Sequence, residues 1–435
     1  MSQLETAATT PAAQGAELSI PQLIADMGRR ARAAAALLTA AAPAAKNEAL
    51  ERAATLFEAR REDIRRENAK DLASGRQRGL SDAMLDRLEL TDARIQAMAT
   101  ALREVAALPD PVGELSHVRV RPNGLRLGKM RAPIGVVGII YESRPNVTAD
   151  AGALCLKSGN AVILRGGSEA LHSNKVLAAL MAEATGAAGL PQDAIQLVPT
   201  TDRAAVGELL RADKFVDIII PRGGKSLIQR IMDESRIPVI KHLDGNCSVY
   251  VDEFADLAMA ETILVNSKTH RYGVCNAAET LLVHEAVAGD FLPRAVAALA
   301  AKGVEIRGCA RTRAIVPQGV VEATEEDWGE EYLAPIIAAR IVDSFDDAVA
   351  FINHYGSHHT DVIVSKDYGR ITAFTRRIDS ACVHVNCSSR FSDGGEYGLG
   401  AEIGISTDKL HARGPMGLEE LTTSKWVALG EGQIR

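Results

Sequence analysis

Cys275 is the residue with the strongest chemical signal in the chain. It lies in the segment SKTHRYGVCNAAETLLVH, closely preceded by His270 and Arg271. Positive neighbours, together with a helix start just after the cysteine, would lower the pKa of the thiol and favour the reactive thiolate. The local sequence leaves two interpretations open, a nucleophile or a buried structural thiol. His270 by itself is more typical of a structural histidine.

A second candidate site is the turn Arg222-Gly223-Gly224, which follows an apolar strand and precedes the helical segment KSLIQRIM. Free N–H groups at a helix start suit a phosphate, although an ordinary tight turn is the alternative. Gly224-Lys225-Ser226 is similar to the end of a P-loop. That motif needs a glycine five positions before Gly224, where this chain has Ile219, so a triphosphate site is excluded. A GxGxxG fingerprint is also absent, which disfavours a standard Rossmann dehydrogenase.

Composition excludes several classes of protein. The net charge of -7 disfavours binding to nucleic acid backbones. The six cysteines form no CxxC pair, which indicates a reducing compartment and at least one functional thiol. The ten histidines are scattered, and His358-His359 has no acidic ligand nearby, so no metal site is expected. We find no signal peptide and no apolar run that would span a bilayer. We therefore expect a cytoplasmic protein that does not bind membranes, with a disordered tail at residues 1–18.

The elements that must position these residues follow from the hydrophobic pattern. Residues 20–108 have helical spacing, as in Ile95, Met98, Leu102 and Val105, with Thr91 or Asp92 as a helix cap. Residues 117–130 then alternate around Asn123-Gly124, which predicts a hairpin with a primed turn. A two-stranded arm is marginal alone, so it must pack on something, plausibly another subunit.

The remainder alternates apolar strands with helical segments and predicts an α/β fold with doubly wound parallel sheets. Such sheets bind ligands at the carboxyl ends of their strands. The first set of predicted strands is 134–141, 161–166, 194–199, 216–221 and 238–243. The second set includes SVYVD, AAETLLVH, EIRGC, TDVIVS and CVHVN, followed by a glycine-rich loop at 391–404 and a last candidate strand, LTTSKWVAL.

Several long stretches carry a resemblance to the aldehyde dehydrogenase superfamily, from about residue 20 to the end. Within it the chain resembles the γ-glutamyl phosphate reductase family. The stretches are APIGVVGIIYESRPNVTADA, NAVILRGGSEALHSN, IIIPRGGKSLIQ, VIKHLDGNC, SKTHRYGVCNAAETLLVH, VNCSSRFSDGGEYGLGAEIGIST and GPMGLEELTTSKWV.

The resemblance implies an aldehyde-dehydrogenase-like architecture of two doubly wound parallel-sheet domains and a β-arm oligomerisation element. The cofactor-binding domain would comprise residues 19–115 and 132–246, and the catalytic domain residues 247–410. The oligomerisation element would comprise residues 116–131 and 411–435. It would pair the hairpin with the strand near Thr422–Leu429 and join the chain into a dimer or tetramer.

The resemblance also implies an activity. It is the NADPH-dependent reduction of L-glutamyl 5-phosphate to L-glutamate 5-semialdehyde and phosphate through a cysteine thioester, the second step of proline biosynthesis from glutamate. Cys275 would be the nucleophile, and Asn146 the oxyanion donor, with Arg144 as the other residue that aligns there. Arg165, Gly223, Gly224, Lys225 and Glu331 would bind NADPH or NADP.

One departure from the family pattern supports acyl transfer to phosphate. Acid-forming relatives carry a water-activating Glu before Leu-Gly-Gly, but the matching segment here is His242-Leu243-Asp244-Gly245. Without that carboxylate the thioester is protected from hydrolysis. We place a structural role for His242 above that of a general base.

The amino-acid end of the substrate needs polar recognition. The segment Asn386-Cys387-Ser388-Ser389-Arg390 follows a strand, and Arg390 is suited to clamp a carboxylate with two bonds, unless it pairs with a surface Asp or Glu. Arg271 is the second candidate, for the carboxylate or the leaving phosphate. The alternatives are a general NAD(P)-dependent aldehyde dehydrogenase, a CoA-acylating dehydrogenase, and a non-catalytic docking partner of glutamate 5-kinase. The same kinase is also a candidate partner if the chain is an enzyme.

Overall fold

The computed structural model describes residues 18–241 and 243–435. Five helices open the described part, as the periodicity predicts. They are α1 (Ile20–Leu38), α2 (Pro43–Ala59), α3 (Arg61–Gln77), α4 (Asp82–Leu88) and α5 (Asp92–Ala107). Thr91 is the cap of α5, because its side chain accepts the Arg94 N–H at 3.2 Å. The predicted face Ile95, Met98, Leu102 and Val105 is buried in a core shared with the first sheet.

The first sheet has four parallel strands in the order β5-β4-β3-β6. The strands are β3 (Val136–Tyr141), β4 (Ala161–Gly166), β5 (Ile195–Leu197) and β6 (Ile218–Arg222). Between and after them come α6 (Asn146–Lys157), η1 (Ser168–Ala170), α7 (Leu171–Ala187), η2 (Gln192–Ala194), α8 (Ala204–Leu210) and α9 (Lys225–Glu234). Strands β3 and β4 are almost wholly buried, which explains their continuous apolar sequences.

The predicted strand at 238–243 is wrong for the residues that the structure describes. The segment makes only one isolated parallel bridge, from Val239 to Ile219. Ile219 donates to the Pro238 carbonyl, and Ile240 donates to Ile219. Pro238 has no N–H to extend the ladder, and the chain leaves this sheet to reach the next one.

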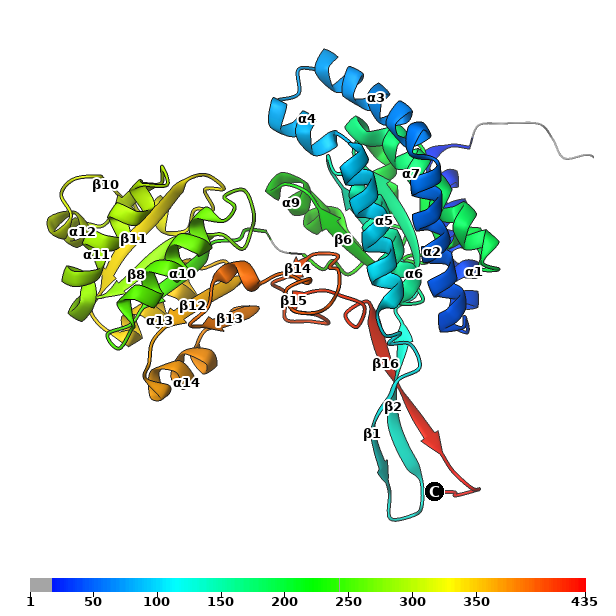
Figure 1. Cartoon of the computed structure of the whole chain (residues 1–435). Helices are drawn as coiled ribbons and strands as arrows, with labels where there is room; N and C mark the ends of the chain where they lie inside the picture. The colour runs from blue at the N-terminus through cyan, green and yellow to red at the C-terminus, as the bar shows by residue number, and fades with distance from the viewer. Residues whose placement is uncertain (1–17, 242) are drawn as a thin grey trace, which may run out of the picture.

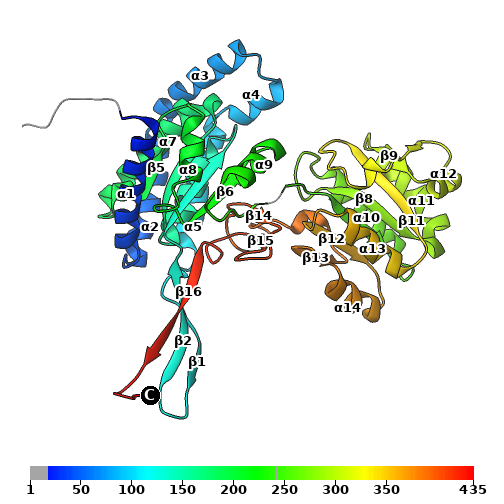
Figure 2. The same cartoon turned by 180° about the vertical axis from the view of Figure 1, so that it is seen from behind.

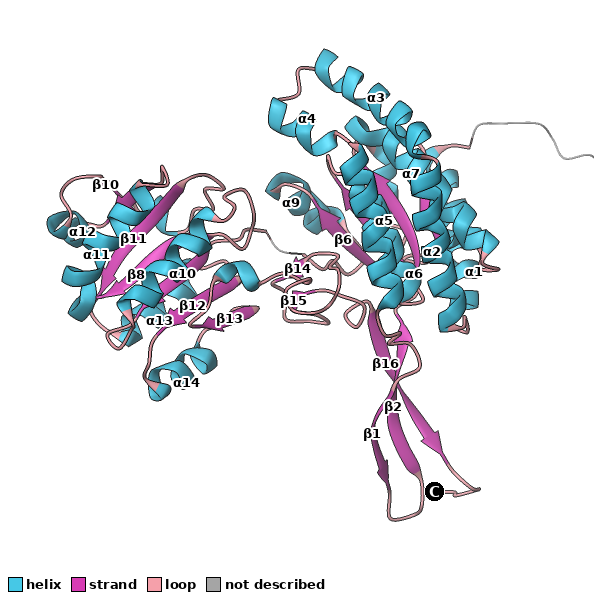
Figure 3. Cartoon of the chain, viewed as in Figure 1, coloured by secondary structure: helices cyan, strands magenta, loops and turns pink. Residues whose placement is uncertain are grey.

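The second sheet has seven parallel strands in the order β10-β9-β11-β8-β7-β12-β13. Five of them match the predicted set: β7 (Cys247–Val251), β8 (Ala278–His284), β9 (Glu305–Gly308), β12 (Thr360–Val364) and β13 (Cys382–Val385). The other two, β10 (Val320–Glu322) and β11 (Ile336–Val342), were not predicted. Their helices are α10 (Leu257–Thr269), α11 (Glu285–Ala300), α12 (Ala310–Ile315), η3 (Glu326–Trp328), α13 (Phe345–Tyr355), α14 (Tyr368–Arg377) and η4 (Ser389–Phe391). Helices flank both sheets (Figure 3), as in a doubly wound fold.

A three-stranded antiparallel arm projects away from both sheets (Figures 1 and 2). It consists of β1 (Leu115–Val120), β2 (Arg126–Pro133) and β16 (Thr422–Leu429), in the order β1-β2-β16. The predicted last strand therefore pairs with the predicted hairpin in this chain, with Trp426 opposite Lys129. A small sheet of β14 (Ile405–Ser406) and β15 (Gly414–Pro415) precedes β16.

The primed turn predicted for the hairpin is wrong. Of the turn residues only Gly124 has a positive φ, 85°. A type I′ turn needs two such residues in succession, and Pro122 holds φ negative at the start of this turn. The Gly124 N–H closes the turn on the Arg121 carbonyl at 2.9 Å. On β1 the strand register shifts at His117, which has a φ of 52°.

Candidate active site

Cys275 lies in the loop between α10 and β8, at the end of the second sheet that faces the first. The predicted helix start just after it is wrong: the buried apolar run from Ala278 continues as strand β8. The loop is held tightly against Gly245. A Cβ added to Gly245 would lie 2.1 Å from the carbonyl oxygen of Cys275 and 2.5 Å from its Cα. The buried Cys247 thiol donates to the same carbonyl at 3.2 Å. Backbone packing thus determines where the Cys275 side chain begins.

A buried ion pair stabilises the two ends of this loop. Lys268, in the last turn of α10, donates to Glu279 on β8 at 2.5 Å, and both side chains are 0% exposed. Burial raises the pKa of Glu279 to about 7 and lowers the pKa of Lys268, while their mutual attraction offsets part of each shift. The pair joins the two elements on either side of Cys275.

Glu331 lies on the loop between η3 and β11, next to the Cys275 loop. Its carboxylate accepts the backbone N–H of Gly245, the residue packed on Cys275. Burial raises the pKa of Glu331, and this hydrogen bond opposes the shift. Two residues further on, the Leu333 N–H donates to Glu279 at 3.3 Å. The expected cofactor-binding Glu331 and the expected nucleophile therefore share supporting residues.

The residues predicted to bind the substrate, in the segment 386–390, differ in their surroundings. The Asn386 side chain exchanges hydrogen bonds with the backbone of Ser365, at 2.9 and 3.0 Å. Ser389 is fully buried and donates to the Asn276 carbonyl at 2.7 Å, while the Ser388 hydroxyl lies 3.0 Å from that of Ser267. These three side chains are occupied within the chain.

Arg390 and Arg271 are placed differently. Arg390 donates from Nε to Nδ1 of His270 at 3.3 Å, and its guanidinium interacts electrostatically with Cys275 and Arg271. Neither arginine has a carboxylate within ion-pair distance among the described residues. Asp393 is the strongest charge partner of Arg390, so the alternative of pairing with a surface acid stays a prediction. Arg390 is linked to Cys275 by charge, and Arg271 lies four residues before it in the sequence.

Asn146 is the first residue of α6 and is exposed. Its side-chain amide donates to the Asp150 carboxylate at 2.9 Å, and burial raises the pKa of Asp150 to about 6. Arg144, two residues earlier, interacts electrostatically with Cys275. Of the two residues considered for the oxyanion position, Arg144 is thus the one linked to the nucleophile by charge.

Apart from Glu331, the residues expected to bind a nicotinamide dinucleotide lie at the carboxyl ends of the first sheet's strands, where such ligands bind. Arg165, at the end of β4, is 7% exposed and donates to the carbonyl of Gly166 at 2.7 Å and to that of Thr201 at 3.2 Å. Its Nε is buried and has no hydrogen-bond partner among the described residues. A buried donor without a partner is costly, and a polar ligand would offset that cost.

The turn from β6 to α9 has the form of an anion site. Gly224 is the N-cap of α9 and provides no side-chain cap. Its N–H donates to the Glu142 carboxylate at 3.0 Å, and a Cβ on Gly223 would fall 2.5 Å from the same carboxylate. Lys225 is exposed and donates to Asp244 at 2.9 Å. An oxyanion already binds this helix start, so the residues fit a pyrophosphate that displaces Glu142.

Two predictions, the structural role of His242 and the disordered tail, stay predictions, because His242 and residues 1–17 lie outside the described residues. Conversely, sequence reasoning missed Gly245 and the Lys268–Glu279 pair. The signals were weak: a glycine in HLDGN, and a lysine and a glutamate in otherwise apolar elements.

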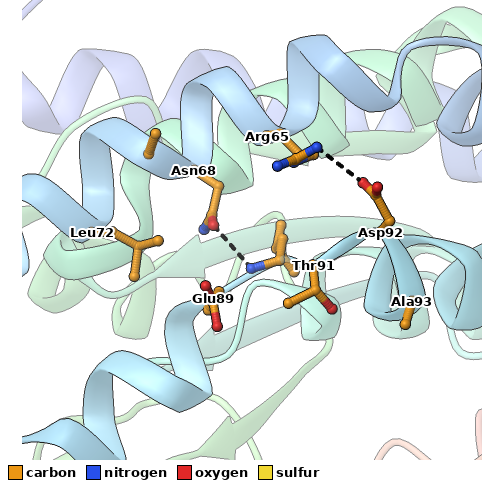
Figure 4. Close-up of a pocket in the computed structure, with 9 residues that line it drawn as sticks. Arg65, Asn68, Leu72, Glu89, Thr91, Asp92 and Ala93 are labelled. Atoms are coloured by element: carbon orange, nitrogen blue, oxygen red, sulfur yellow. Dashed lines mark hydrogen bonds and ion pairs between the residues drawn. The ribbon is translucent and has the colours of Figure 1, made fainter.

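Two hollows lie elsewhere on the described chain. One of about 450 Å³ lies between α3 and the α4–α5 connection (Figure 4). There Arg65 pairs with Asp92 at 3.5 Å, and Asn68 accepts the Leu90 N–H at 2.9 Å. Asn68 also donates to the Leu88 carbonyl and so fixes the end of α4. The other, of about 620 Å³, is bordered by Cys309, α13 and the end of β11.

Within residues 18–241 and 243–435, no group of three or more His, Cys, Asp or Glu side chains is arranged to hold a metal ion. Among the same residues no helix has the length and apolarity needed to cross a membrane.

Comparison with known proteins identifies the family of this chain. The sequence matches the aldehyde dehydrogenase family over residues 11–307 and 313–427. It is 46% identical to a crystallised γ-glutamyl phosphate reductase from Thermotoga maritima, covering 95% of this chain and 99% of that one, with a TM-score of 0.93. The γ-glutamyl phosphate reductase of Saccharomyces cerevisiae is 29% identical over 96% of this chain and 99% of its own, with a TM-score of 0.52. An acetylating aldehyde dehydrogenase from Geobacillus thermoglucosidasius, at 20% identity, 96% and 98% coverage and a TM-score of 0.67, shares the fold.

The chain therefore belongs to the aldehyde dehydrogenase family and, within it, to the γ-glutamyl phosphate reductases. The predicted α/β class and its parallel sheets are confirmed. Members of this family are oxidoreductases that act on small molecules with NAD or NADP.

Proposed function

We propose that this chain reduces L-glutamyl 5-phosphate to L-glutamate 5-semialdehyde and phosphate, the second step of proline biosynthesis from glutamate, through a thioester on Cys275. One observation carries the proposal. A chain 46% identical to a γ-glutamyl phosphate reductase over nearly the whole of both chains has a cysteine loop packed on Gly245, and Arg144 and Arg390 interact electrostatically with that cysteine.

The chemistry begins at the Cys275 thiolate. The sulfur attacks the acyl carbon, the bond from that carbon to the phosphate oxygen breaks, and phosphate leaves with the electron pair. A thioester remains on the chain. When bound, the nicotinamide cofactor supplies the hydride that reduces this thioester. The thiohemiacetal on Cys275 then collapses, releasing the aldehyde and restoring the thiolate. Covalent catalysis divides one difficult reduction into two easier steps.

The chain's own residues must stabilise the developing oxyanion. The Cys275 N–H is one donor, and its position is determined by the contact with Gly245. Asn146 is the proposed second donor, provided that its amide turns from Asp150 toward the substrate. Loss of one such donor typically costs about 3–4 kcal/mol of transition-state stabilisation.

Recognition of the cofactor is assigned to the first sheet and to Glu331. Gly223, Gly224 and Lys225 would hold the pyrophosphate at the start of α9, and Glu331 the nicotinamide ribose. NADPH is proposed over NADH because Arg165 interacts with Arg203 and Arg230, in addition to Glu169, its strongest charge partner. An arginine in such a position suits a 2′-phosphate.

Recognition of the amino-acid end is assigned to Arg390, with Arg271 beside it. Asn386, Ser388 and Ser389, first considered as substrate ligands, are better suited to shape the loop. The Ser388 hydroxyl accepts the backbone N–H of Arg390 at 3.2 Å and so caps η4, which carries that arginine.

The arm points to self-association. Its exposed apolar side chains include Val118 (54%), Val120 (70%) and Trp426 (59%), and its three strands form one layer. A sheet of this kind is stable when its apolar side chains are covered. We propose that a second copy covers it in a dimer or tetramer.

We propose glutamate 5-kinase as a further partner, because the acyl phosphate that it makes is labile. The six free thiols suit a cytoplasmic location.

The test is oxidation of glutamate 5-semialdehyde with NADP, with and without phosphate, for the native chain and for Cys275→Ala. We expect phosphate-dependent NADP reduction that the variant loses. Turnover without phosphate or CoA would instead identify an acid-forming aldehyde dehydrogenase, and a requirement for CoA an acylating one. Undiminished turnover in Cys275→Ala would refute the thioester. A chain that binds glutamate 5-kinase without turnover would be a docking partner.

A further inference from the structure

The loop between η3 and β11, which carries Glu331, has a strained backbone. Leu333, two residues after Glu331, has a φ of 51°, in the left-handed region that a bulky side chain rarely adopts. Its side chain is 47% exposed, so packing of that side chain does not hold the backbone there. The Tyr332 hydroxyl donates to Asp327 at 2.7 Å, but this long side chain leaves the torsions of Leu333 free. Contacts of the Leu333 backbone must therefore enforce the strain.

Those contacts come from the two sides of the Cys275 region. The Leu333 N–H donates to Oε1 of Glu279, near the start of β8, at 3.3 Å. The Leu333 carbonyl oxygen lies 4.0 Å from the position that a Cβ on Gly273 would take. Of these two contacts only the hydrogen bond is directional, so Glu279 is the residue that orients this backbone.

Glu279 is itself held by Lys268. Its other carboxylate oxygen, Oε2, accepts from Lys268 at 2.5 Å, and both side chains are 0% exposed. The largest charge effects on Glu279 are the attraction of Lys268 and the repulsion of Glu331, and Lys268 also attracts Glu331. A buried ion pair is weak evidence for stability, because an apolar pair of similar volume is often as stable. An apolar pair, however, would offer no acceptor to the Leu333 N–H.

We propose that Glu279 is a positioning residue for cofactor binding: by accepting the Leu333 N–H it fixes the backbone of the loop that presents Glu331 beside Gly245 and Cys275. This inference rests on the proposed function, in which Glu331 holds the nicotinamide ribose. Glu279 is fully buried and acts through Leu333. A loop released from Glu279 has to become ordered when the cofactor binds, and that ordering weakens binding.

The test measures NADPH binding to the full-length protein by fluorescence titration, in two double variants that both remove the buried charges. Lys268→Met with Glu279→Gln retains a side-chain oxygen for the Leu333 N–H, whereas Lys268→Met with Glu279→Met does not. The second should bind NADPH about tenfold more weakly than the first, because one hydrogen bond that orders the loop is lost. Alkylation of Cys275 by iodoacetamide should differ by less than about threefold, because Gly245 sets that backbone.

Two further measurements separate positioning from folding. Glu279→Asp keeps a charge opposite Lys268 but is one methylene shorter, so it withdraws the acceptor from Leu333 and should raise the Kd for NADPH. In a Glu331→Ala background the two double variants should bind NADPH equally, because the carboxylate that Glu279 positions has been removed. Glu326→Gln, an exposed change on η3, is the control and should leave the Kd and the alkylation rate native.

Several results would overturn the inference. One is an equal affinity for NADPH in the two double variants, or a native affinity in Glu279→Asp where either double variant fails to fold. Another is a tenfold difference that persists in the Glu331→Ala background, or a Cys275 alkylation rate that falls in parallel with affinity. A native Kd in Glu331→Ala would overturn the cofactor role of Glu331 together with the inference. Phosphate-independent turnover of the native enzyme would instead overturn the proposed function.

Discussion

Gly245→Ala tests how closely catalysis depends on the backbone beneath Cys275. The φ of Gly245 lies outside the left-handed region, so alanine meets no conformational penalty there. Its Cβ, however, would lie 2.1 Å from the Cys275 oxygen and 2.5 Å from its Cα, whereas ordinary contact begins at 3.4 Å. Both obstructing atoms are backbone, which cannot rotate away. The Cys275 loop must therefore move by about 1 Å, and a shift of that size costs roughly 100-fold in rate.

The expected loss in kcat corresponds to about 2.7 kcal/mol of transition-state stabilisation. Overpacking should also lower the free energy of unfolding by about 1–3 kcal/mol. Turnover is measured in the phosphate-dependent reverse reaction, and the reactivity of Cys275 by its rate of alkylation with iodoacetamide. Calorimetry gives the stability of the same samples.

Gly273→Ala is the matched control. Gly273 is in the same loop, but a Cβ there meets only the Leu333 carbonyl oxygen at 4.0 Å. That variant should retain native kcat and alkylation rate within about threefold, since no atom has to move. Retention of more than about a third of native kcat by Gly245→Ala would refute the argument, because a displaced nucleophile is its central claim.

Three other predictions concern the supports of the site. The bonds from neighbouring residues hold the pKa of Asp327 at about 2, below the ordinary value of 3.8, against the opposing effect of burial. The contribution of ionised Asp327 to the free energy of unfolding is therefore complete above pH 3.8 and is lost as the pH falls toward 2. Asp327→Asn should lower the free energy of unfolding by about 2 kcal/mol at neutral pH and flatten the acid limb of its pH dependence. Lys268→Met should leave the buried Glu279 carboxylate unpaired and cost about 3–5 kcal/mol, of which the double variant with Glu279→Gln should recover a large part in chemical denaturation. Glu169→Ala should remove both hydrogen bonds that hold the left-handed backbone of Ser143 and lower the free energy of unfolding by about 1–3 kcal/mol, and an unchanged midpoint in chemical denaturation would contradict this role.

Local patterns were sufficient for much of this protein. Helical spacing located the opening helices, and continuous apolar runs located β3, β4, β7, β8 and β12. Each of these signals depends on residues adjacent in sequence. The long stretches shared with the aldehyde dehydrogenase superfamily identified the class of protein, since they carry the family's own residues in order.

Elements whose form depends on distant partners were predicted less well. The residues just after Cys275 allowed both a helix start and the strand AAETLLVH, and pairing with β7 and β11 decides for the strand. The run at 238–243 lacks the partners that would extend its single bridge. In the hairpin, Pro122 excluded the primed turn that Asn123-Gly124 suggested.

The sequence by itself determined the helix start at Gly224 and the class of fold, because each is encoded in consecutive residues, and it made Cys275 the proposed nucleophile. Only the tertiary structure decided the environment of that nucleophile. Gly245 lies 30 positions before Cys275 and yet sets its backbone. Arg144 and Arg390 come from separate elements, and both interact electrostatically with Cys275. Packing and electrostatics act through space, so these interactions exist only once both sheets have folded.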